Sequence, residues 1–349
     1  MVLATGIGSM PQKKPPEAID LIFKYTPSVP FWPQLPKRSI YEGMILQFSE
    51  GFSFLKSSSQ GLIYDADNSQ KGLEDFYSRI IDEDIDYFKI TSDFAFGLYL
   101  FYERLKKLDL KNIHFIKLQI TGPFTFLGSI KDEKGNFVLQ DEVIMEAVAK
   151  GLTRKALWQI KFFTEFNKRI ILFFDEPYLS CFGSAYTPIN REQIIKTLMG
   201  VFKELKDLSI KRLNLKSEDL LIGIHCCGNT DWSIFTELPQ LDIISFDAFN
   251  FGDKVSLYAK ELKKFLERKG ILCWGLVPTL EFDDRMDEDF LLERFNLLLD
   301  EFIKKGLDKE LILESLFLSP SCGLGNVEEE KSSKILRILF NLSQKFPLN

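Results

Sequence analysis

The sequence predicts an α/β fold, a TIM (β/α)8 barrel, formed by one domain that spans residues 1–349. Short apolar runs of the kind buried in parallel sheets alternate with amphipathic stretches of helical period, about eight times along the chain. The length of 349 residues lies within the range of about 200 to 400 that such a barrel takes. An open, doubly wound sheet is the rival fold, and the lack of G-x-G-x-x-G after any strand counts against it.

Seven apolar runs predict strands, at residues 3–8, 114–120, 170–174, 220–224, 243–246, 271–276 and 312–318. For the eighth strand the sequence offers two candidates, residues 87–90 and 44–48. Residues 27–67 are rich in Pro, Ser and aromatic side chains and predict an irregular insertion over the barrel mouth, with a hairpin at 61–65. Gly135-Asn136 predicts a second hairpin, at 131–137.

Capping residues and helical periodicity predict helices at residues 72–81, 93–108, 141–167, 190–208, 254–269, 287–305 and 326–346. Asn190, followed by Gln193, resembles a capping box, and Asp253 is the expected N-cap of the helix at 254–269. Gly270 and Gly306 are expected to end their helices.

Composition excludes several classes of function. The 44 basic and 50 acidic residues give a net charge of −6, so neither nucleic acid nor an anionic membrane is an expected partner. No apolar run is long enough to span a membrane, and the N-terminal lysines follow a short apolar run, which is the wrong order for a secretory signal. The five cysteines are too few for a disulfide scaffold. We therefore expect a cytoplasmic protein with reduced thiols.

Chemically capable side chains collect where the predicted strands end, which is the catalytic face of a barrel. His225 and Cys227 end one strand and share a side of it, because strand side chains alternate with period two. Cys322 follows the last strand, and Asp175 and Asp247 end two others. One imidazole and two thiols make three ligands, the number found in a catalytic zinc site with an open fourth position. Asp247 could occupy that position when no substrate is bound. A thiol bound to zinc becomes a thiolate, so the pattern favours alkyl transfer to sulfur.

Plainer roles stay open for several of these residues. His225 and Cys227 alone could be structural, and Cys322 at another strand end is what favours a metal. Cys181 and Cys273 are expected to pack as small apolar side chains, and Cys226 is expected to point to the opposite side of its strand. The run Asp175-Glu176-Pro177 could also cap a helix.

Five short motifs, in order along the chain, resemble those of the cobalamin-independent methionine synthase family and its superfamily. They are Ile7-Gly8-Ser9-Met10-Pro11, Thr121-Gly122-Pro123-Phe124-Thr125, Asp175-Glu176-Pro177, His225-Cys226-Cys227-Gly228-Asn229 and Cys322-Gly323-Leu324. The His-Cys run is closer to the H-x-C-G-N of methylcobamide:coenzyme M methyltransferases in the same superfamily. The resemblance implies a single catalytic barrel and a zinc ion, Zn(2+), held by His225, Cys227 and Cys322. The family's glutamate ligand falls on Asp247, whose side chain is one methylene shorter.

The resemblance also implies a reaction, the transfer of a methyl group to the thiol of homocysteine to give methionine. Ile7, Ser9 and Asp175 would hold the amino-acid end of homocysteine, and Glu50 would be a second carboxylate for its ammonium group. The family's larger members carry a second barrel that helps to hold a folate donor, so for this chain the resemblance implies a methylated corrinoid protein as donor. Another thiol acceptor such as coenzyme M, a metal-free decarboxylase of the uroporphyrinogen type, and a non-catalytic thiol or zinc carrier are the alternatives.

Overall fold

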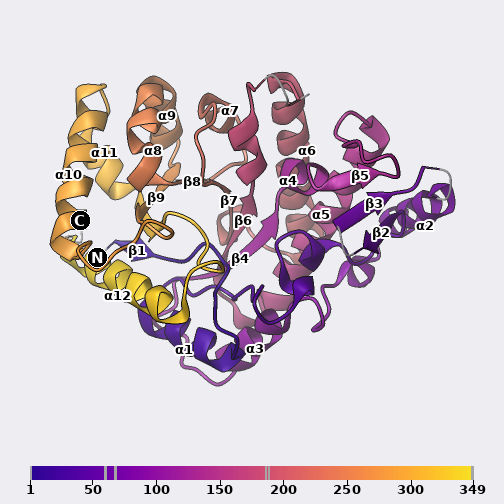
Figure 1. Ribbon diagram of the computed structural model, residues 1–349, viewed down its shortest axis with the longest axis horizontal. Coiled ribbons are helices and arrows are strands. Elements are labelled where there is room, and N and C mark those ends of the chain that lie inside the picture. Colours follow the sequence, from indigo (N-terminus) through magenta and orange to yellow (C-terminus); the bar gives the residue numbers. More distant parts are fainter. Residues whose placement is uncertain (1, 59–60, 67–68, 185–186, 188, 347–349) are drawn as a thin grey trace.

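A computed structural model describes residues 2–58, 61–66, 69–184, 187 and 189–346. Its centre is a curled sheet of seven parallel strands in the order β1-β10-β9-β8-β7-β6-β4, with helices around the outside (Figure 1). The strands are β1 (Leu3–Ala4), β4 (Phe115–Thr121), β6 (Arg169–Asp175), β7 (Leu220–Cys226), β8 (Ile243–Phe246), β9 (Ile271–Val277) and β10 (Leu316–Pro320). The predicted α/β class and parallel sheet are confirmed, and a complete eight-stranded barrel stays a prediction.

Residues 28–34 lie between β1 and β4, where an eighth strand would be expected. The backbone N–H of Lys117 donates to Pro30 at 2.9 Å, and that of Gln34 donates to Gly8 at 3.0 Å. These contacts form isolated bridges rather than a strand, because prolines at 27, 30 and 33 lack the N–H that a continuous ladder needs. Both predicted positions for the eighth strand are wrong, since they fall on the 3-10 helices Ile85–Phe88 and Leu46–Phe48.

The outer helices are α1 (Pro15–Tyr25), α2 (Gln70–Ile81), α3 (Phe96–Leu105), α4 (Pro123–Leu127), α5 (Glu142–Phe163), α6 (Arg191–Leu213), α7 (Ser233–Thr236), α8 (Ala248–Val255), α9 (Ala259–Glu267), α10 (Glu288–Lys304), α11 (Lys309–Glu314) and α12 (Glu329–Lys345). Each stretch predicted to be helical contains helix, although the one at 254–269 is divided between α8 and α9, and α1 and several short helices were not predicted. Further 3-10 turns lie at Ile40–Glu42, Thr164–Phe166, Pro177–Cys181, Ser217–Asp219 and Ser256–Tyr258. No helix built from the described residues is long and apolar enough to cross a membrane.

Caps explain which helix boundaries were predictable. Asp141, Asn190 and Asp287 each accept a hydrogen bond from the first turn of their helices, as expected for N-cap residues. The predicted start at Asp253 is wrong, because Asp247 caps α8 instead and the helix is interrupted before α9. The predicted strand at 312–318 begins too early, since its first half belongs to α11. Likewise α12 begins at Glu329 rather than at residue 326.

A second, three-stranded sheet lies beside the curled sheet and is built mostly from the predicted insertion. Strands β2 (Leu55–Ser58) and β3 (Gly61–Tyr64) are antiparallel, and β5 (Ile130–Asp132) pairs with β3 in parallel. The hairpin predicted at 61–65 therefore involves an earlier strand, and residues 59–60 between the two strands lie outside the described residues. A bridge between Lys131 and Phe137 confirms the hairpin predicted there.

The interior of the curled sheet is apolar at its base and polar near its carboxyl ends. The base cluster consists of Leu3, Val29, Phe115, Ile171, Phe173, Leu221, Ile243, Ile271, Cys273 and Phe317. Cys273 is fully buried there, which confirms its predicted packing role, whereas Cys181 is exposed and its predicted core position is wrong. Position along the strands thus separates a supporting base from a polar layer at the carboxyl ends.

Lys155, on α5, is a buried amine that the sequence did not single out. Its side chain is fully buried, and its Nζ has no hydrogen-bond partner among the described residues. Burial lowers the pKa of Lys155 to about 7, with the charge of Glu50 opposing the shift. Holding a charged amine in this position costs folding free energy.

We expect Lys155→Met to stabilise the protein, by about 2–4 kcal/mol at pH 6.5. The pKa in the folded state lies below that of the unfolded chain, so between about pH 7 and 10.5 the unfolded state binds more protons and wild-type stability rises with pH. The advantage of the variant is therefore expected to shrink toward pH 9.5. Urea unfolding at both pH values measures the difference in free energy of unfolding between the variant and the wild type. Lys150→Met, on the same helix, is the control. Equal stabilisation at pH 6.5 and pH 9.5 would contradict the lowered pKa assigned to the buried Lys155 amine.

Candidate metal centre and acceptor site

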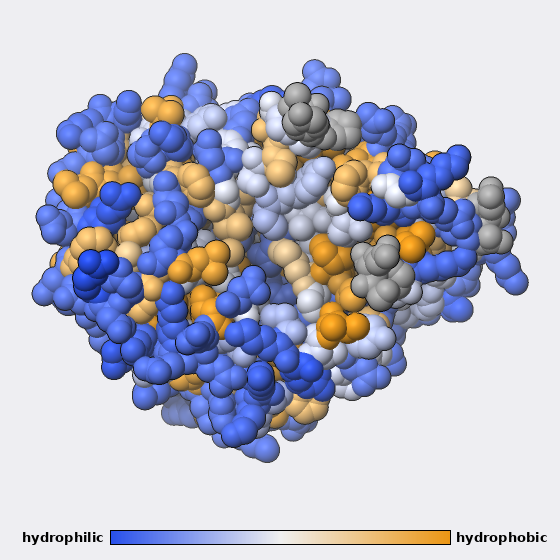
Figure 2. Space-filling view, in the orientation of Figure 1, coloured by the Kyte–Doolittle hydropathy of each residue, from blue (hydrophilic) through white to orange (hydrophobic). Residues whose placement is uncertain are grey.

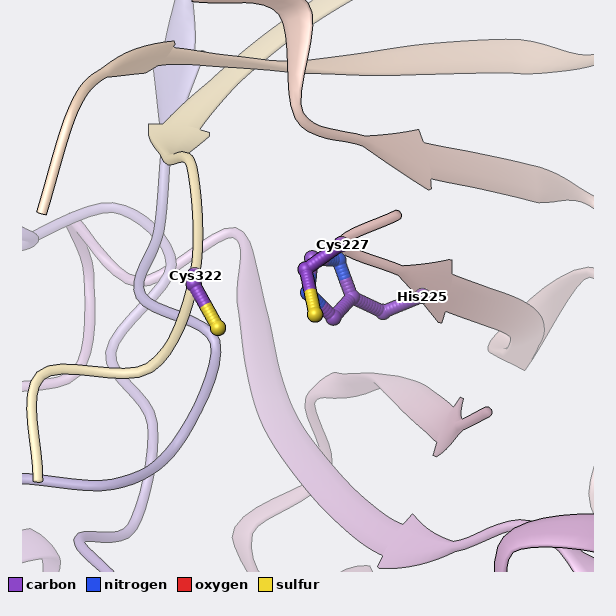
Figure 3. A group of neighbouring side chains, drawn as sticks. All are labelled: His225, Cys227 and Cys322. Carbon is purple, nitrogen blue, oxygen red and sulfur yellow. The ribbon is translucent and has the colours of Figure 1, made fainter. Parts of the chain in front are cut away.

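Three predicted ligands converge at the carboxyl ends of the strands. His225 lies on β7, Cys227 directly follows that strand, and Cys322 lies in the loop after β10. One ligand atom from each lies within 4.8 Å of the others, and Figure 3 shows the two sulfurs and the imidazole directed into the same space. In a flat sheet β7 and β10 would be about 14 Å apart, three strand spacings. The curl of the sheet is therefore what brings the three side chains together.

The imidazole of His225 is fixed from the neighbouring strand. Its Nδ1 lies 3.0 Å from the hydroxyl of Ser245, its register partner on β8. The ring is 2% exposed, and its Nε2 has no hydrogen-bond partner among the described residues. An unsatisfied buried nitrogen is costly, whereas a metal-binding histidine typically uses one nitrogen for the ion and the other for an orienting hydrogen bond. The geometry of His225 fits a metal ligand.

The two sulfurs are electrostatically coupled. A hydrogen bond from the Cys322 thiol lowers the pKa of Cys227 to about 4; His225 adds to this effect and burial opposes it. The pKa of Cys322 is raised by the same hydrogen bond, because the shared proton stays on its sulfur. Zinc takes cysteine as the thiolate and histidine as the neutral ring. The Cys227 sulfur therefore favours the thiolate form that zinc binds. One imidazole and two sulfurs are a donor set that suits zinc.

Cys226 faces away from this group, as its place between the two ligands on β7 predicts. It is fully buried in the outer core, and its thiol lies 3.5 Å from the carbonyl oxygen of Gly228. Burial raises its pKa to about 12. The predicted packing role of Cys226 is confirmed.

Asp175 ends β6 directly beside His225 in the sheet register. Its side chain is 3% exposed, and its Oδ1 has no hydrogen-bond partner among the described residues. Burial raises the pKa of Asp175 to about 6, while Lys117 and His225 oppose the increase. A buried carboxylate oxygen without a partner is suited to bind a cationic group of a ligand.

The first and last motifs of the chain form one wall of the site. The backbone N–H of Gly325 donates to Oγ of Ser9 at 3.1 Å, and that of Leu324 donates to the Ser9 carbonyl at 2.9 Å. A Cβ at Gly323 would lie 2.2 Å from Ser9 Oγ, so only glycine permits this approach. Ser9 and its neighbour Ile7 are thereby held next to the loop that carries Cys322.

Glu176 links the Asp175-Glu176-Pro177 motif to the motif at residues 121–125. Its carboxylate caps α4, a short helix that was not predicted. Its carboxylate accepts hydrogen bonds from the backbone N–H groups of Phe124 and Thr125 at 2.9 and 2.8 Å and from the Thr125 hydroxyl at 2.7 Å. It therefore caps α4, while the turn that follows Pro177 has no side-chain cap. Burial raises the pKa of Glu176 to about 7, against these three hydrogen bonds. A Cβ at Gly122 would lie 2.3 Å from this carboxylate, which explains the glycine.

Two predicted carboxylates lie apart from the group of three ligands. Both oxygens of Glu50 are taken up by Thr91, through its backbone N–H at 2.7 Å and its hydroxyl at 2.8 Å. Both oxygens of Asp247 accept from Asn250, at 2.8 Å each, and its carboxylate lies outside the cluster of possible metal ligands.

Lys117 and Gln119 are interior polar residues that sequence analysis missed. Both are fully buried on β4, and the amine of Lys117 donates to the carbonyl of Ile7 at 2.6 Å. Gln119 donates to the carbonyl of Trp32 at 2.8 Å, which ties β4 to the segment at 28–34. The signal was present in the run Phe-Ile-Lys-Leu-Gln-Ile, where two polar residues share one face of an otherwise apolar strand.

Two solved structures share this fold. A B12-independent methionine synthase from Shewanella sp. W3-18-1, in complex with selenomethionine, superposes with a TM-score of 0.57 at 13% identity, over 99% of this chain and 97% of that chain. A putative vitamin-B12-independent methionine synthase from Listeria monocytogenes gives a TM-score of 0.50 at 18% identity, over 95% of this chain and 85% of that chain. No protein-family model and no curated protein matches the sequence. At these identities the likeness establishes the architecture.

Proposed function

We propose that this protein is a zinc-dependent methyltransferase that methylates the thiol of homocysteine to give methionine, with residues 1–349 acting as one catalytic domain. The observation that carries the proposal is the convergence of His225, Cys227 and Cys322 beside the buried, unpartnered Oδ1 of Asp175. The likeness to two methionine synthase structures supports the same class of enzyme. The resemblance of five ordered sequence motifs to the same family also supports it.

The chain's own residues would bind and orient the acceptor. A zinc ion held by His225, Cys227 and Cys322 would supply the Lewis acidity that keeps an acceptor thiol deprotonated near neutral pH. Asp175 would pair with the ammonium group of homocysteine, while Ile7 and Ser9 would position its amino-acid end. The acceptor sulfur then forms the new S–CH3 bond with its own electron pair, as the bond between methyl and donor breaks and its electrons leave with the donor.

Two further assignments belong to the same proposal. Asp247 would be the fourth ligand in the absence of acceptor, after giving up its bonds to Asn250, and Glu50 would add negative charge near the acceptor's ammonium. The donor would be a methylated corrinoid protein that docks over the mouth. Ile40, in the 3-10 helix Ile40–Glu42, and Leu280, in the loop after β9, are 71% and 66% exposed. Figure 2 shows apolar patches on both sides of the centre of the face that it draws.

A metal measurement combined with a transfer assay tests the proposal. Purified protein is expected to bind about one zinc per chain and to form methionine from homocysteine with methylcobalamin as methyl donor. Methyltetrahydrofolate alone is expected to give no product. Product from folate would overturn the donor assignment, and a preference for coenzyme M over homocysteine would overturn the acceptor. Bound zinc without transfer from any donor would favour a non-catalytic zinc protein.

A further inference from the structure

A buried ammonium group lies inside the curled sheet, below the acceptor site. The Nζ of Lys117 donates to the carbonyl oxygen of Ile7 at 2.6 Å and to Oε1 of Gln119 at 3.3 Å. It also lies 4.5 Å from the centre of the Phe173 ring, two residues before Asp175 on β6. Lys117 is fully buried, so its direction is set by these contacts.

Packing does not explain a lysine at this position. A buried charge costs several kcal/mol unless it is paired, and an apolar residue of similar length would fill the space without that cost. Among the described residues no carboxylate forms an ion pair with Lys117, whose amine contacts Ile7, Gln119 and Phe173, although the charge of Asp175 acts on it. An ammonium and a carboxylate are thus buried in the same interior without contact, and Oδ1 of Asp175 has no partner.

The hydrogen bond to Ile7 links Lys117 to the wall of the acceptor site. Ile7 precedes Gly8, whose carbonyl accepts from the backbone N–H of Gln34, and Ser9 follows with its bonds to the Cys322 loop. The amine of Lys117 therefore holds the backbone of the I-G-S motif from below. The charge of Asp175, the other residue assigned to the acceptor's amino-acid end, acts on this amine.

We propose that Lys117 is a positioning residue that makes the site selective for thiols carrying an α-amino group. It fixes the carbonyl of Ile7, and its charge offsets that of the buried Asp175 carboxylate until the acceptor's ammonium arrives. This inference rests on the proposed function and adds to it a residue that does not touch the metal. Lys117 acts through Ile7 and Asp175, so its removal is expected to change the recognition of the amino group and not that of the sulfur.

Thiol binding to protein loaded with Co(2+) tests the proposal without turnover. The two cysteine ligands already give a thiolate-to-cobalt absorption band, and its increase on titration reports binding of homocysteine and of 4-mercaptobutanoate, which lacks the amino group. Lys117→Met is expected to weaken the binding of homocysteine about tenfold or more. It is expected to weaken the binding of 4-mercaptobutanoate by less than about twofold. Lys117→Arg is expected to restore part of the selectivity. In an Asp175→Asn background the same Lys117→Met change is expected to have a smaller effect, since the two residues act together.

The outcomes separate this inference from the proposed function. If the wild-type protein binds no cobalt and shows no thiolate band, the metal site itself is wrong. If the wild type binds both thiols but Lys117→Met changes both equally, or neither, the role of Lys117 is overturned. Should Lys117→Met fail to fold, Lys117→Gln takes its place as a neutral hydrogen-bond donor. Loss of the fold in both neutral variants would make Lys117 a structural residue and would also overturn the proposal.

Discussion

Replacing Cys322 with serine is expected to reduce bound zinc from about one per chain to less than about a tenth and to abolish methyl transfer to homocysteine. The proposed centre has three candidate ligand atoms within 4.8 Å of one another, so each sulfur would supply a large share of the binding energy. A serine hydroxyl stays protonated near neutral pH and is a poor ligand for zinc. Cys227→Ser is expected to have the same effect, because the thiolate is favoured on that sulfur. Elemental analysis of dialysed protein measures the metal.

The chain offers matched controls for these variants. Cys181 is exposed and Cys226 faces the outer core, so Cys181→Ser and Cys226→Ala are expected to keep wild-type zinc content. Wild-type stoichiometry in both Cys227→Ser and Cys322→Ser would show that the metal site is misassigned. Loss of zinc in Cys181→Ser would point to a different set of ligands.

The convergence of the ligands was predictable because it depends on local pattern and on one property of barrels. His225 lies on β7 and Cys227 directly follows it, so strand periodicity predicts a common side for the two, and the carboxyl ends of parallel strands meet at one face. No long-range contact had to be inferred to place Cys322 near them once its strand was assigned. The strands themselves were found because buried parallel strands are nearly continuous apolar runs.

The features that were missed depend on tertiary context. Residues 28–34 complete the wall between β1 and β4 through a few hydrogen bonds, and their prolines hide any strand pattern. The N-cap role of Asp247 was masked by a second good cap, Asp253, within the same helical stretch. Lys117 was missed because its shortest hydrogen bond goes to the carbonyl of Ile7, 110 positions away, and nothing in the local pattern of the strand points to that partner.

Asp175→Asn is expected to raise the KM for homocysteine about 100-fold while leaving the turnover of 4-mercaptobutanoate within about threefold of wild type. The asparagine side chain keeps the shape of the aspartate but lacks the charge that would pair with the ammonium group. Asp175 is 3% exposed and its Oδ1 has no partner among the described residues, so little solvent screens this interaction. Steady-state kinetics with methylcobalamin as donor, at saturating zinc, measures both acceptors.

Asp242→Asn provides the comparison, because Asp242 lies at the opposite end of the sheet, where it pairs with Lys206 at 3.0 Å. That variant can lose stability but is expected to keep the preference for homocysteine. If Asp175→Asn slowed both thiols equally, Asp175 would be supporting the metal centre through its neighbour His225 rather than binding the acceptor's ammonium. If it slowed neither, the amino-acid end of the acceptor would lie elsewhere in the mouth, and the assignment of Ile7 and Ser9, on the opposite wall, would lose its basis as well.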